Sequence, residues 1–277
     1  MYIFRDTETA FVSKNNTEEL LMNFIATAST DIGNTKSTNQ DSFGVRTMTT
    51  TLGKMAFAVL CDGMGGLSKG EVASSAVVRA FYEWVDTKLP ILCTNGLSDD
   101  VIRNDWTRIV VDSNEKIKAY GAIRGISIGT TVTAILVTAR RYYIINVGDT
   151  RAYEIADSIR ILTKDHTVVA KEIEYGRLTP EDAEKDPRKS VLLQCVGASD
   201  TVVPDLFFGD TAGNTVYMLC SDGFRHEISE SEIHRYLHPE VMTDESGMKN
   251  NIDLLISINK QRQERDNITA VSIRTFD

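Results

Sequence analysis

The sequence lacks the features that mark secreted, membrane-spanning and nucleic-acid-binding proteins. Its four cysteines show no C-x-x-C spacing, so we expect reduced, buried thiols rather than a disulfide framework. No apolar run approaches the roughly 18 residues of a membrane span, and residues 1–16 are too polar for a signal peptide. A net charge of −9 disfavours nucleic acid and anionic membranes, because both would repel the chain. These absences predict a cytoplasmic protein that binds neither nucleic acid nor a membrane.

Several phosphate- and metal-binding signatures are also missing. The sequence contains neither G-x₄-G-K-[ST] nor H-E-x-x-H, which excludes a P-loop and the common zinc-protease motif. Cys220 is followed by Arg225 one residue too soon for the C-x₅-R loop of cysteine-dependent phosphatases. The stretch 63–68 nearly matches G-x-G-x-x-G, but Ser68 replaces the last glycine, which makes dinucleotide binding a weak interpretation.

The remaining composition is typical of a soluble globular protein. The chain has 277 residues, of which 42% are hydrophobic, and no repeat, linker or low-complexity segment divides it. Residues 1–20 are mixed and polar, and we expect them to form a peripheral N-terminal extension. Residues 21–277 are predicted to form a single domain.

The pattern of apolar residues predicts a mixed fold with antiparallel sheets. The strand 55–61 reads as buried on both faces, and it is followed by a helix with Ser68 and Glu71 as a capping box and Pro90 at its end. A second helix is expected from Ser98 to about Tyr120. Closely spaced strands indicate an antiparallel meander, and residues 166–190 carry little core and read as a flap. The expected strands are 24–29, 43–46, 130–139, 142–147, 151–155, 158–162, 191–196, 216–220 and 268–274, with further helices around 230–237 and 249–260.

Three aspartates stand where apolar strands end or begin, namely Asp62, Asp222 and Asp266. A single Asp-Gly pair is most often a turn. Three carboxylates gathered in one pocket would repel one another unless cations neutralised them. Oxygen ligands of this kind suit Mg²⁺ or Mn²⁺. Together with Asp41, the three aspartates therefore favour a metal site over three unrelated turns.

Seven short motifs, in their order along the chain, resemble those of the type 2C, or PPM, family of metal-dependent serine/threonine protein phosphatases. The resemblance runs from about Phe24 to the C-terminus, and its Asp-Gly-Met-Gly-Gly form is similar to bacterial members. It implies an α+β fold, a four-layer α/β/β/α sandwich of two antiparallel sheets flanked by helices. The motifs are 36–41 (KSTNQD), 62–66 (DGMGG), 129–131 (GTT), 148–153 (GDTRAY), 162–166 (LTKDH), 220–223 (CSDG) and 266–269 (DNIT).

The resemblance also implies a role for each matching residue. Asp62 would bridge two Mg²⁺ or Mn²⁺ ions, and the Gly63 carbonyl would complete the second. Asp222 and Asp266 would hold the first ion. Asp41 would act near the ions, directly or through water, and Lys36 would bind phosphate. The implied reaction is hydrolysis of phosphoserine and phosphothreonine on proteins by water that the two ions activate, in opposition to a serine/threonine kinase, by a monomeric enzyme.

Three departures from the family pattern leave alternatives open. Lys36 stands where relatives usually have arginine, and Met64 where some have a histidine that serves as a candidate general acid. No acidic residue lies between Gly121 and Thr131, which leaves a third metal site in question. The alternative is a catalytically weak family member that acts as a phosphoprotein-binding or scaffold protein. A small-molecule phosphatase is a further alternative within the enzyme class.

Overall fold

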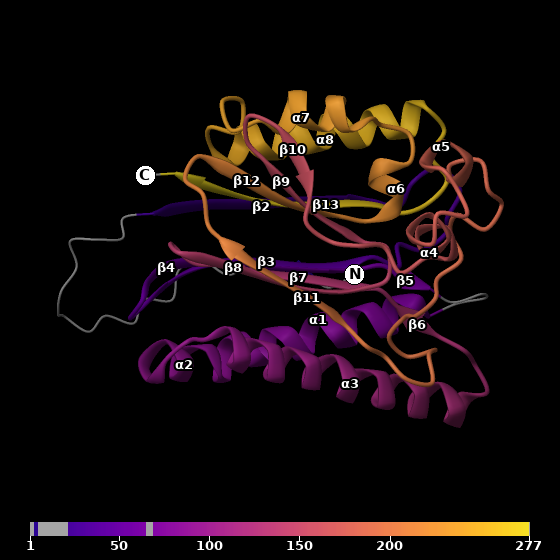
Figure 1. Ribbon diagram of the computed structural model, residues 1–277, viewed down its shortest axis with the longest axis horizontal. Coiled ribbons are helices and arrows are strands. Elements are labelled where there is room, and N and C mark those ends of the chain that lie inside the picture. Colours follow the sequence, from indigo (N-terminus) through magenta and orange to yellow (C-terminus); the bar gives the residue numbers. More distant parts are fainter. Residues whose placement is uncertain (1–2, 5–21, 65–68, 277) are drawn as a thin grey trace.

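Two facing β-sheets form the centre of the molecule, with helices outside each (Figure 1). The computed structural model describes residues 3–4, 22–64 and 69–276. Within these residues, one sheet has six strands in the order β1-β3-β4-β7-β8-β11 and the other has five in the order β10-β9-β12-β13-β2. Neighbouring strands of the described sheets are antiparallel, except that β1 runs parallel to β3. The strands are β1 (Ile3–Phe4), β2 (Asn23–Asp31), β3 (Ser42–Thr50), β4 (Gly53–Cys61), β5 (Gly63–Met64), β6 (Gly129–Thr130), β7 (Val132–Val137), β8 (Arg141–Val147), β9 (Arg151–Ile155), β10 (Ile159–Ile161), β11 (Asp205–Asp210), β12 (Thr215–Cys220) and β13 (Ile268–Phe276).

Helices on both outer faces complete the four layers that the sequence predicts. In Figure 1, α1, α2 and α3 lie below the six-stranded sheet, and α7 and α8 lie above the five-stranded sheet. This arrangement confirms the predicted α/β/β/α sandwich. The helices are α1 (Gly70–Thr87), α2 (Leu89–Asn95), α3 (Asp99–Arg124), α4 (Val168–Glu174), α5 (Pro180–Ala183), α6 (Asp222–Arg225), α7 (Glu230–Leu237) and α8 (Glu245–Gln261).

The central strand β4 is buried on both faces, as its apolar sequence predicts. Phe57 and Val59 pack toward α1 and α3, where Trp106 fills the same cluster. Ala58 and Leu60 alternate with them and pack against the other sheet. Burial on both faces fixes the register of β4, because a shift by one residue would exchange the two faces. The strand thereby holds its last residue, and the aspartate after it, in one place.

The predicted meander does not stay in one sheet. β8 belongs to the six-stranded sheet and β9 to the five-stranded sheet, so the chain crosses between the layers after Val147. Gly148 makes the crossing with a φ of +105°, and a Cβ there would lie 2.7 Å from Cβ of Thr131. Only glycine fits this backbone without strain and collision. The crossing carries Asp149 to the edge between the two sheets.

Other predictions need correction. Residues 191–196 form only isolated bridges, from Leu192 to Thr167 and from Val196 to Thr130, and their apolar side chains are in part exposed. Strand β11 was not predicted, since its short apolar core gives little signal without its partner β8. Pro90 lies in the first turn of α2 instead of ending a helix region, since proline fits a position that needs no N–H donor. The predicted cap Ser68 and most of the extension 1–20 lie outside the described residues.

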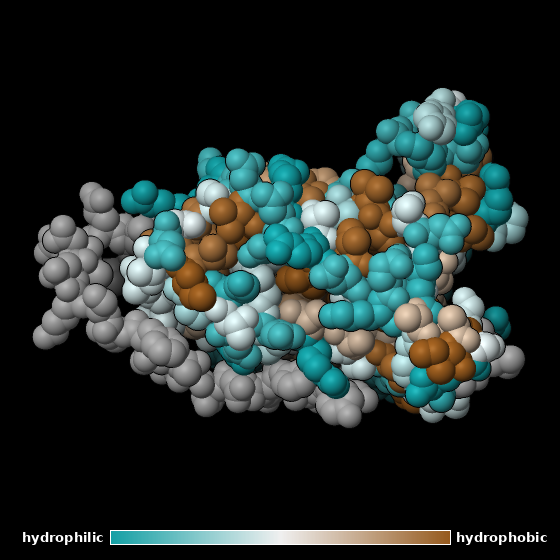
Figure 2. Space-filling view, turned by 90° about the horizontal axis from the view of Figure 1, so that it is seen from below, coloured by the Kyte–Doolittle hydropathy of each residue, from teal (hydrophilic) through white to brown (hydrophobic). Residues whose placement is uncertain are grey.

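Exposed apolar side chains do not gather into one patch on the face that α1, α2 and α3 cover. Figure 2 shows this face with several separate brown groups among teal residues. The exposed apolar residues there include Ile91, Val111 and Ile123. No helix in the described part of the chain is both long enough and apolar enough to cross a lipid bilayer.

Candidate metal centre

Asp62 is held by its backbone at the junction of β4 and β5. Its N–H donates to Oγ1 of Thr131 at 2.9 Å, and its carbonyl accepts from the Thr131 N–H at the same distance. The Thr130 hydroxyl donates to that carbonyl as well, also at 2.9 Å. The two threonines of the 129–131 motif therefore satisfy the main chain of Asp62 and leave its carboxylate available.

Asp41 and Asp222 each carry a buried carboxylate oxygen with no hydrogen-bond partner. Oδ2 of Asp41 accepts from the Thr269 hydroxyl at 2.5 Å, but Oδ1 has no partner, although only 1% of the residue is exposed. Oδ1 of Asp222 is likewise buried without a partner. Buried polar atoms are nearly always paired, and two carboxylate oxygens without a partner are donors that suit a hard cation.

Asp266 lies opposite Lys36, with 2.7 Å between its Oδ1 and Nζ of the lysine. Partial burial lowers the pKa of Lys36, but the hydrogen bond and charge of Asp266, with the charges of Asp62 and Asp222, more than offset this and raise it. The ammonium group is therefore firmly protonated and faces the carboxylate cluster. Lys36 is about two-fifths exposed, so it can also reach a ligand from solvent.

The acidic residues predicted from the sequence lie within electrostatic range of one another. Burial raises the pKa of Asp62 well above its usual range, and the charges of its acidic neighbours raise it further. Burial likewise raises the pKa of Asp41 to about 7, although the Thr269 hydroxyl opposes the shift. Carboxylates this close disfavour ionisation unless positive charge is present. The neighbours that act on Asp62 are Asp41, Asp222, Asp149 and Asp266.

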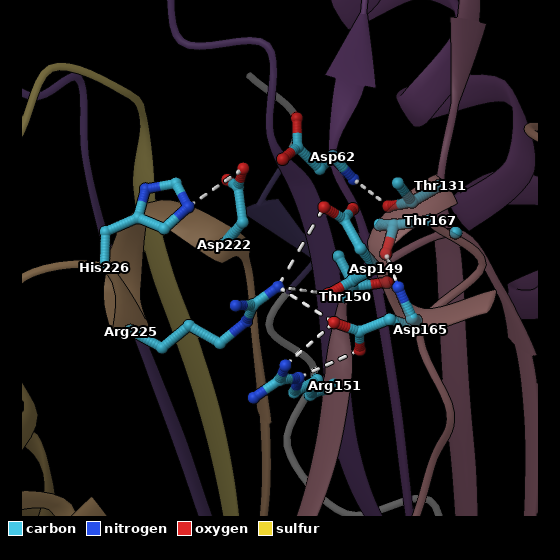
Figure 3. A network of polar contacts seen from close by, with 12 residues as sticks. Asp62, Thr131, Asp149, Thr150, Arg151, Asp165, Thr167, Asp222, Arg225 and His226 are labelled. Carbon is cyan, nitrogen blue, oxygen red and sulfur yellow. Dashed lines mark hydrogen bonds and ion pairs between the residues drawn. The ribbon is translucent and has the colours of Figure 1, made fainter. Parts of the chain in front are cut away.

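Asp149 belongs to this cluster and was not among the predicted site residues. Figure 3 shows its carboxylate beside those of Asp62 and Asp222. Burial and the charge of Asp222 raise its pKa to about 7, although Arg225 opposes the shift. It lies two residues after the end of β8, as Asp222 lies two residues after the end of β12, so its place near a strand end could have identified it. The prediction of a hairpin at this point, instead of a crossing between sheets, concealed it.

Two arginines support the lower side of the cluster in Figure 3. Arg151 binds Asp165 through two hydrogen bonds, of 2.9 and 2.8 Å. Arg225 lies 3.5 Å from the same carboxylate and donates to the Asp149 carbonyl at 3.0 Å. Arg225 thus connects the segment after Asp222 with the segment after β8.

The backbone around Gly63 is too crowded for any side chain. Its N–H donates to the Gln40 carbonyl at 3.2 Å. In the amide orientation that pairs both of its polar atoms, the Gln40 side chain donates to the Gly63 carbonyl at 3.3 Å and accepts from the Gly70 N–H at 3.0 Å. A Cβ on Gly63 would lie 2.4 Å from the Gly70 carbonyl oxygen. Gly63 and the start of α1 are therefore packed backbone to backbone next to Asp62.

We expect Gly63→Ala to lower the free energy of unfolding by about 1–3 kcal/mol, because the new methyl group must displace α1 or residue 40. Urea unfolding followed by fluorescence measures the change. The matched control is Gly247→Ala in α8, where a Cβ meets nothing closer than 3.7 Å. Equal stability of the two variants would contradict the predicted crowding.

The donor set fits a divalent cation, although it is not tightly closed. Within the described ranges, no three His, Cys, Asp or Glu side chains already stand close enough to enclose an ion. The structure does bring Asp41, Asp62, Asp222 and Asp266 together at one end of the sandwich, with two orphaned oxygens among them. All of these donors are oxygens, which suits Mg²⁺ or Mn²⁺ rather than a soft metal.

A protein-family model described as protein phosphatase 2C matches residues 33–254. The chain belongs to the protein phosphatase 2C family. The match begins just before Lys36 and covers the segments that carry Asp41, Asp62, Asp149 and Asp222. Family membership confirms the resemblance inferred from the seven motifs and the prediction that the protein is a phosphatase.

Several named relatives of this protein phosphatase 2C member are bacterial. The chain is 29% identical over 250 residues to the serine/threonine phosphatase stp of Listeria innocua, covering 88% of this chain and 93% of that protein. Its fold is similar to the crystal structure of the Mycobacterium tuberculosis serine/threonine phosphatase PstP/Ppp, with a TM-score of 0.76, 28% identity, and coverage of 92% of this chain and 99% of that one. A catalytic-domain structure of PstP in complex with two manganese ions has a TM-score of 0.75 and 27% identity, covering 92% of this chain and 100% of that one.

Proposed function

We propose that the protein hydrolyses phosphoserine and phosphothreonine on proteins, using two Mg²⁺ or Mn²⁺ ions. The observation that carries this proposal is that four aspartates lie within electrostatic range of one another, and that two of them have a buried carboxylate oxygen without a partner. The four are Asp41, Asp62, Asp222 and Asp266. Relatives named as serine/threonine phosphatases support the substrate class, and the manganese complex of PstP supports the ions.

The proposed ligands are those that the resemblance to the family implies. Asp62 would bridge both ions, with Asp222 and Asp266 on the first and the Gly63 carbonyl on the second. Asp41 would approach the ions through Oδ1, directly or through water. When bound, two such ions supply the Lewis acidity that makes water nucleophilic at neutral pH. Bound ions would also offset the repulsion among the carboxylates.

Lys36 would bind the phosphoryl group. Its ammonium already lies beside Asp266, where it can hold a phosphate oxygen next to the metal ligands. Charge on the phosphoryl oxygens is the main feature to be stabilised in phosphoryl transfer. Lysine offers a point charge, whereas the guanidinium of arginine can form two parallel hydrogen bonds to phosphate. Lysine therefore binds phosphate with less directional preference.

Lys36→Arg is therefore expected to lower KM for a phosphothreonine peptide about 3- to 10-fold, since one more charge-assisted hydrogen bond contributes about 1 kcal/mol. Steady-state kinetics at saturating Mn²⁺ measures the change. Lys54→Arg is the matched control, because Lys54 makes an exposed hydrogen bond to Asn23, in another part of the molecule. An unchanged or higher KM would contradict the expected gain from the second hydrogen bond to phosphate.

The direct test of the proposed function is release of inorganic phosphate from phosphothreonine and phosphoserine peptides with Mn²⁺ present. A parallel panel of small phosphate esters separates a protein phosphatase from a small-molecule phosphatase. The protein is expected to prefer the peptides, and preference for the esters would overturn the proposed substrate class. The alternative of a catalytically weak phosphoprotein-binding member is not favoured, because the named relatives are phosphatases. Opposition to a kinase, a cytoplasmic location and a monomeric state stay predictions.

A further inference from the structure

A histidine and a glutamate outside the seven motifs join the segments that carry two of the proposed ligands. His226 lies one turn after Asp222, and Glu264 lies two residues before Asp266. Nδ1 of His226 is 3.3 Å from Oε2 of Glu264, and Nε2 is 3.5 Å from Oδ2 of Asp222. Figure 3 shows the imidazole reaching Asp222 from the side opposite Asp62. The imidazole thus bridges a glutamate and a proposed metal ligand.

The glutamate continues this connection into the backbone of Asp266. Oε1 of Glu264 accepts hydrogen bonds from the N–H groups of Arg265, at 2.6 Å, and Asp266, at 2.8 Å. Its side chain is only 5% exposed. One continuous set of polar contacts therefore runs from the Asp222 carboxylate through His226 and Glu264 to the main chain of Asp266.

The turn that presents Glu264 closes the C-terminus of α8. Gln263 has a φ of +69°, in the left-handed region that non-glycine residues seldom adopt. The N–H of Glu264 donates to the Asn259 carbonyl at 3.0 Å, which fixes the end of the turn. The Gln263 N–H also donates to the Lys260 carbonyl at 3.1 Å, and this pair of hydrogen bonds around a left-handed residue is a common way for a helix to end. The cap of α8 thereby holds the Glu264 carboxylate beside His226.

The two carboxylate oxygens of Asp222 have different surroundings. Oδ2 faces His226, whereas Oδ1 is the buried oxygen without a partner. Both ring nitrogens face carboxylate oxygens, so the imidazole contacts Asp222 and Glu264 at the same time. Partners that orient ligand carboxylates in this way commonly change metal affinity 10- to 100-fold when they are removed.

We propose that His226 and Glu264 are positioning residues that fix the spacing of Asp222 and Asp266 and thereby set the affinity of the first metal ion. The inference rests on the proposed function, because it assumes that Asp222 and Asp266 hold that ion. Neither residue touches substrate. Their effect is therefore expected on ion binding, and much less on the rate of the saturated enzyme.

Mn²⁺ titration by isothermal calorimetry, without substrate, tests the inference. The variants are His226→Gln, Glu264→Gln and the double variant, with His234→Gln as control, since His234 contacts the Ala156 carbonyl in another part of the five-stranded layer. Each single variant should weaken the binding of one of the two Mn²⁺ ions about 10- to 100-fold. The affinity for the other ion should not change, and the control variant should bind both ions as the wild type does. The double variant should bind Mn²⁺ no more weakly than the single variant with the lower affinity, because the two residues act as one unit.

Kinetics give an independent readout. The Mn²⁺ concentration for half-maximal activity should rise together with the Mn²⁺ dissociation constant measured by calorimetry, while kcat at saturating Mn²⁺ is largely retained. Wild-type affinity in both single variants would overturn the inference while leaving the proposed function intact. A wild-type protein that binds no Mn²⁺ would overturn both. If His226→Gln fails to fold, Glu264→Gln still decides the matter, because its amide oxygen can accept the same two backbone hydrogen bonds without the charge.

Discussion

Asp62→Asn is expected to lower kcat/KM on a phosphothreonine peptide by about 10³-fold or more, equivalent to about 4 kcal/mol of transition-state stabilisation. The change removes the charge of the carboxylate that would bridge both ions, and it leaves the shape and the backbone contacts to Thr131 intact. Steady-state kinetics across a range of Mn²⁺ concentrations measures the loss. Excess Mn²⁺ should not restore the rate.

The same substitution should have the opposite effect on stability when metal is removed. Burial and the neighbouring carboxylates disfavour the charged form of Asp62, so a neutral amide relieves repulsion in the folded protein. We expect Asp62→Asn to melt at a higher temperature than the wild type in EDTA. Asp210→Asn serves as control, because Asp210 lies at the exposed end of β11. Near-full activity of Asp62→Asn would refute the assignment of Asp62.

Removal of divalent ions is expected to abolish activity and to make stability depend on pH. In EDTA the folded protein binds protons at Asp41 and Asp149, whose pKa values are raised to about 7, more tightly than the unfolded chain does. The unfolded chain therefore binds fewer protons, so the free energy of unfolding falls as pH rises from the ordinary carboxyl range through about 7. The melting temperature in EDTA should be lower at pH 8 than at about pH 5.5.

Adding back metal should reverse this trend. Ions that bind the folded state alone stabilise it by about 2.7 kcal/mol at a concentration 100 times their Kd. Their affinity rises with pH because the ligands must be deprotonated. Scanning calorimetry with and without Mn²⁺ measures the difference, with Asp41→Asn as a variant that should flatten the metal-free profile. A metal-free protein that is more stable at pH 8 would contradict the predicted carboxylate cluster.

Local signals in the sequence predict the main strands and helices, whereas the four-layer arrangement was inferred from the resemblance to the family. The continuous apolar run of β4 and the amphipathic pattern of α1 and α3 can be recognised from the sequence alone. Strand β11 and the bridges around residues 191–196 depend on distant partners, which spacing along the chain does not reveal. The crossing at Gly148 was missed for the same reason, since a turn between strands looks alike whether it closes a hairpin or connects two sheets.

The candidate site was predicted to a similar extent. Carboxylates within two residues of a buried strand were identified because strand ends are visible in the sequence. Asp149 has this pattern and was overlooked only through the wrong turn assignment. His226 and Glu264 could not have been found in this way, because their pairing depends on how α6 and the turn before β13 approach each other.

The most direct measurement is the anomalous difference map of a crystal grown with Mn²⁺. We predict two peaks about 3.5–4 Å apart, with the Asp62 carboxylate between them and Asp222 and Asp266 on one ion. A map with no peak at Asp62, or with a single ion that Asp62 does not touch, would contradict the central claim that this carboxylate joins two ions in one site.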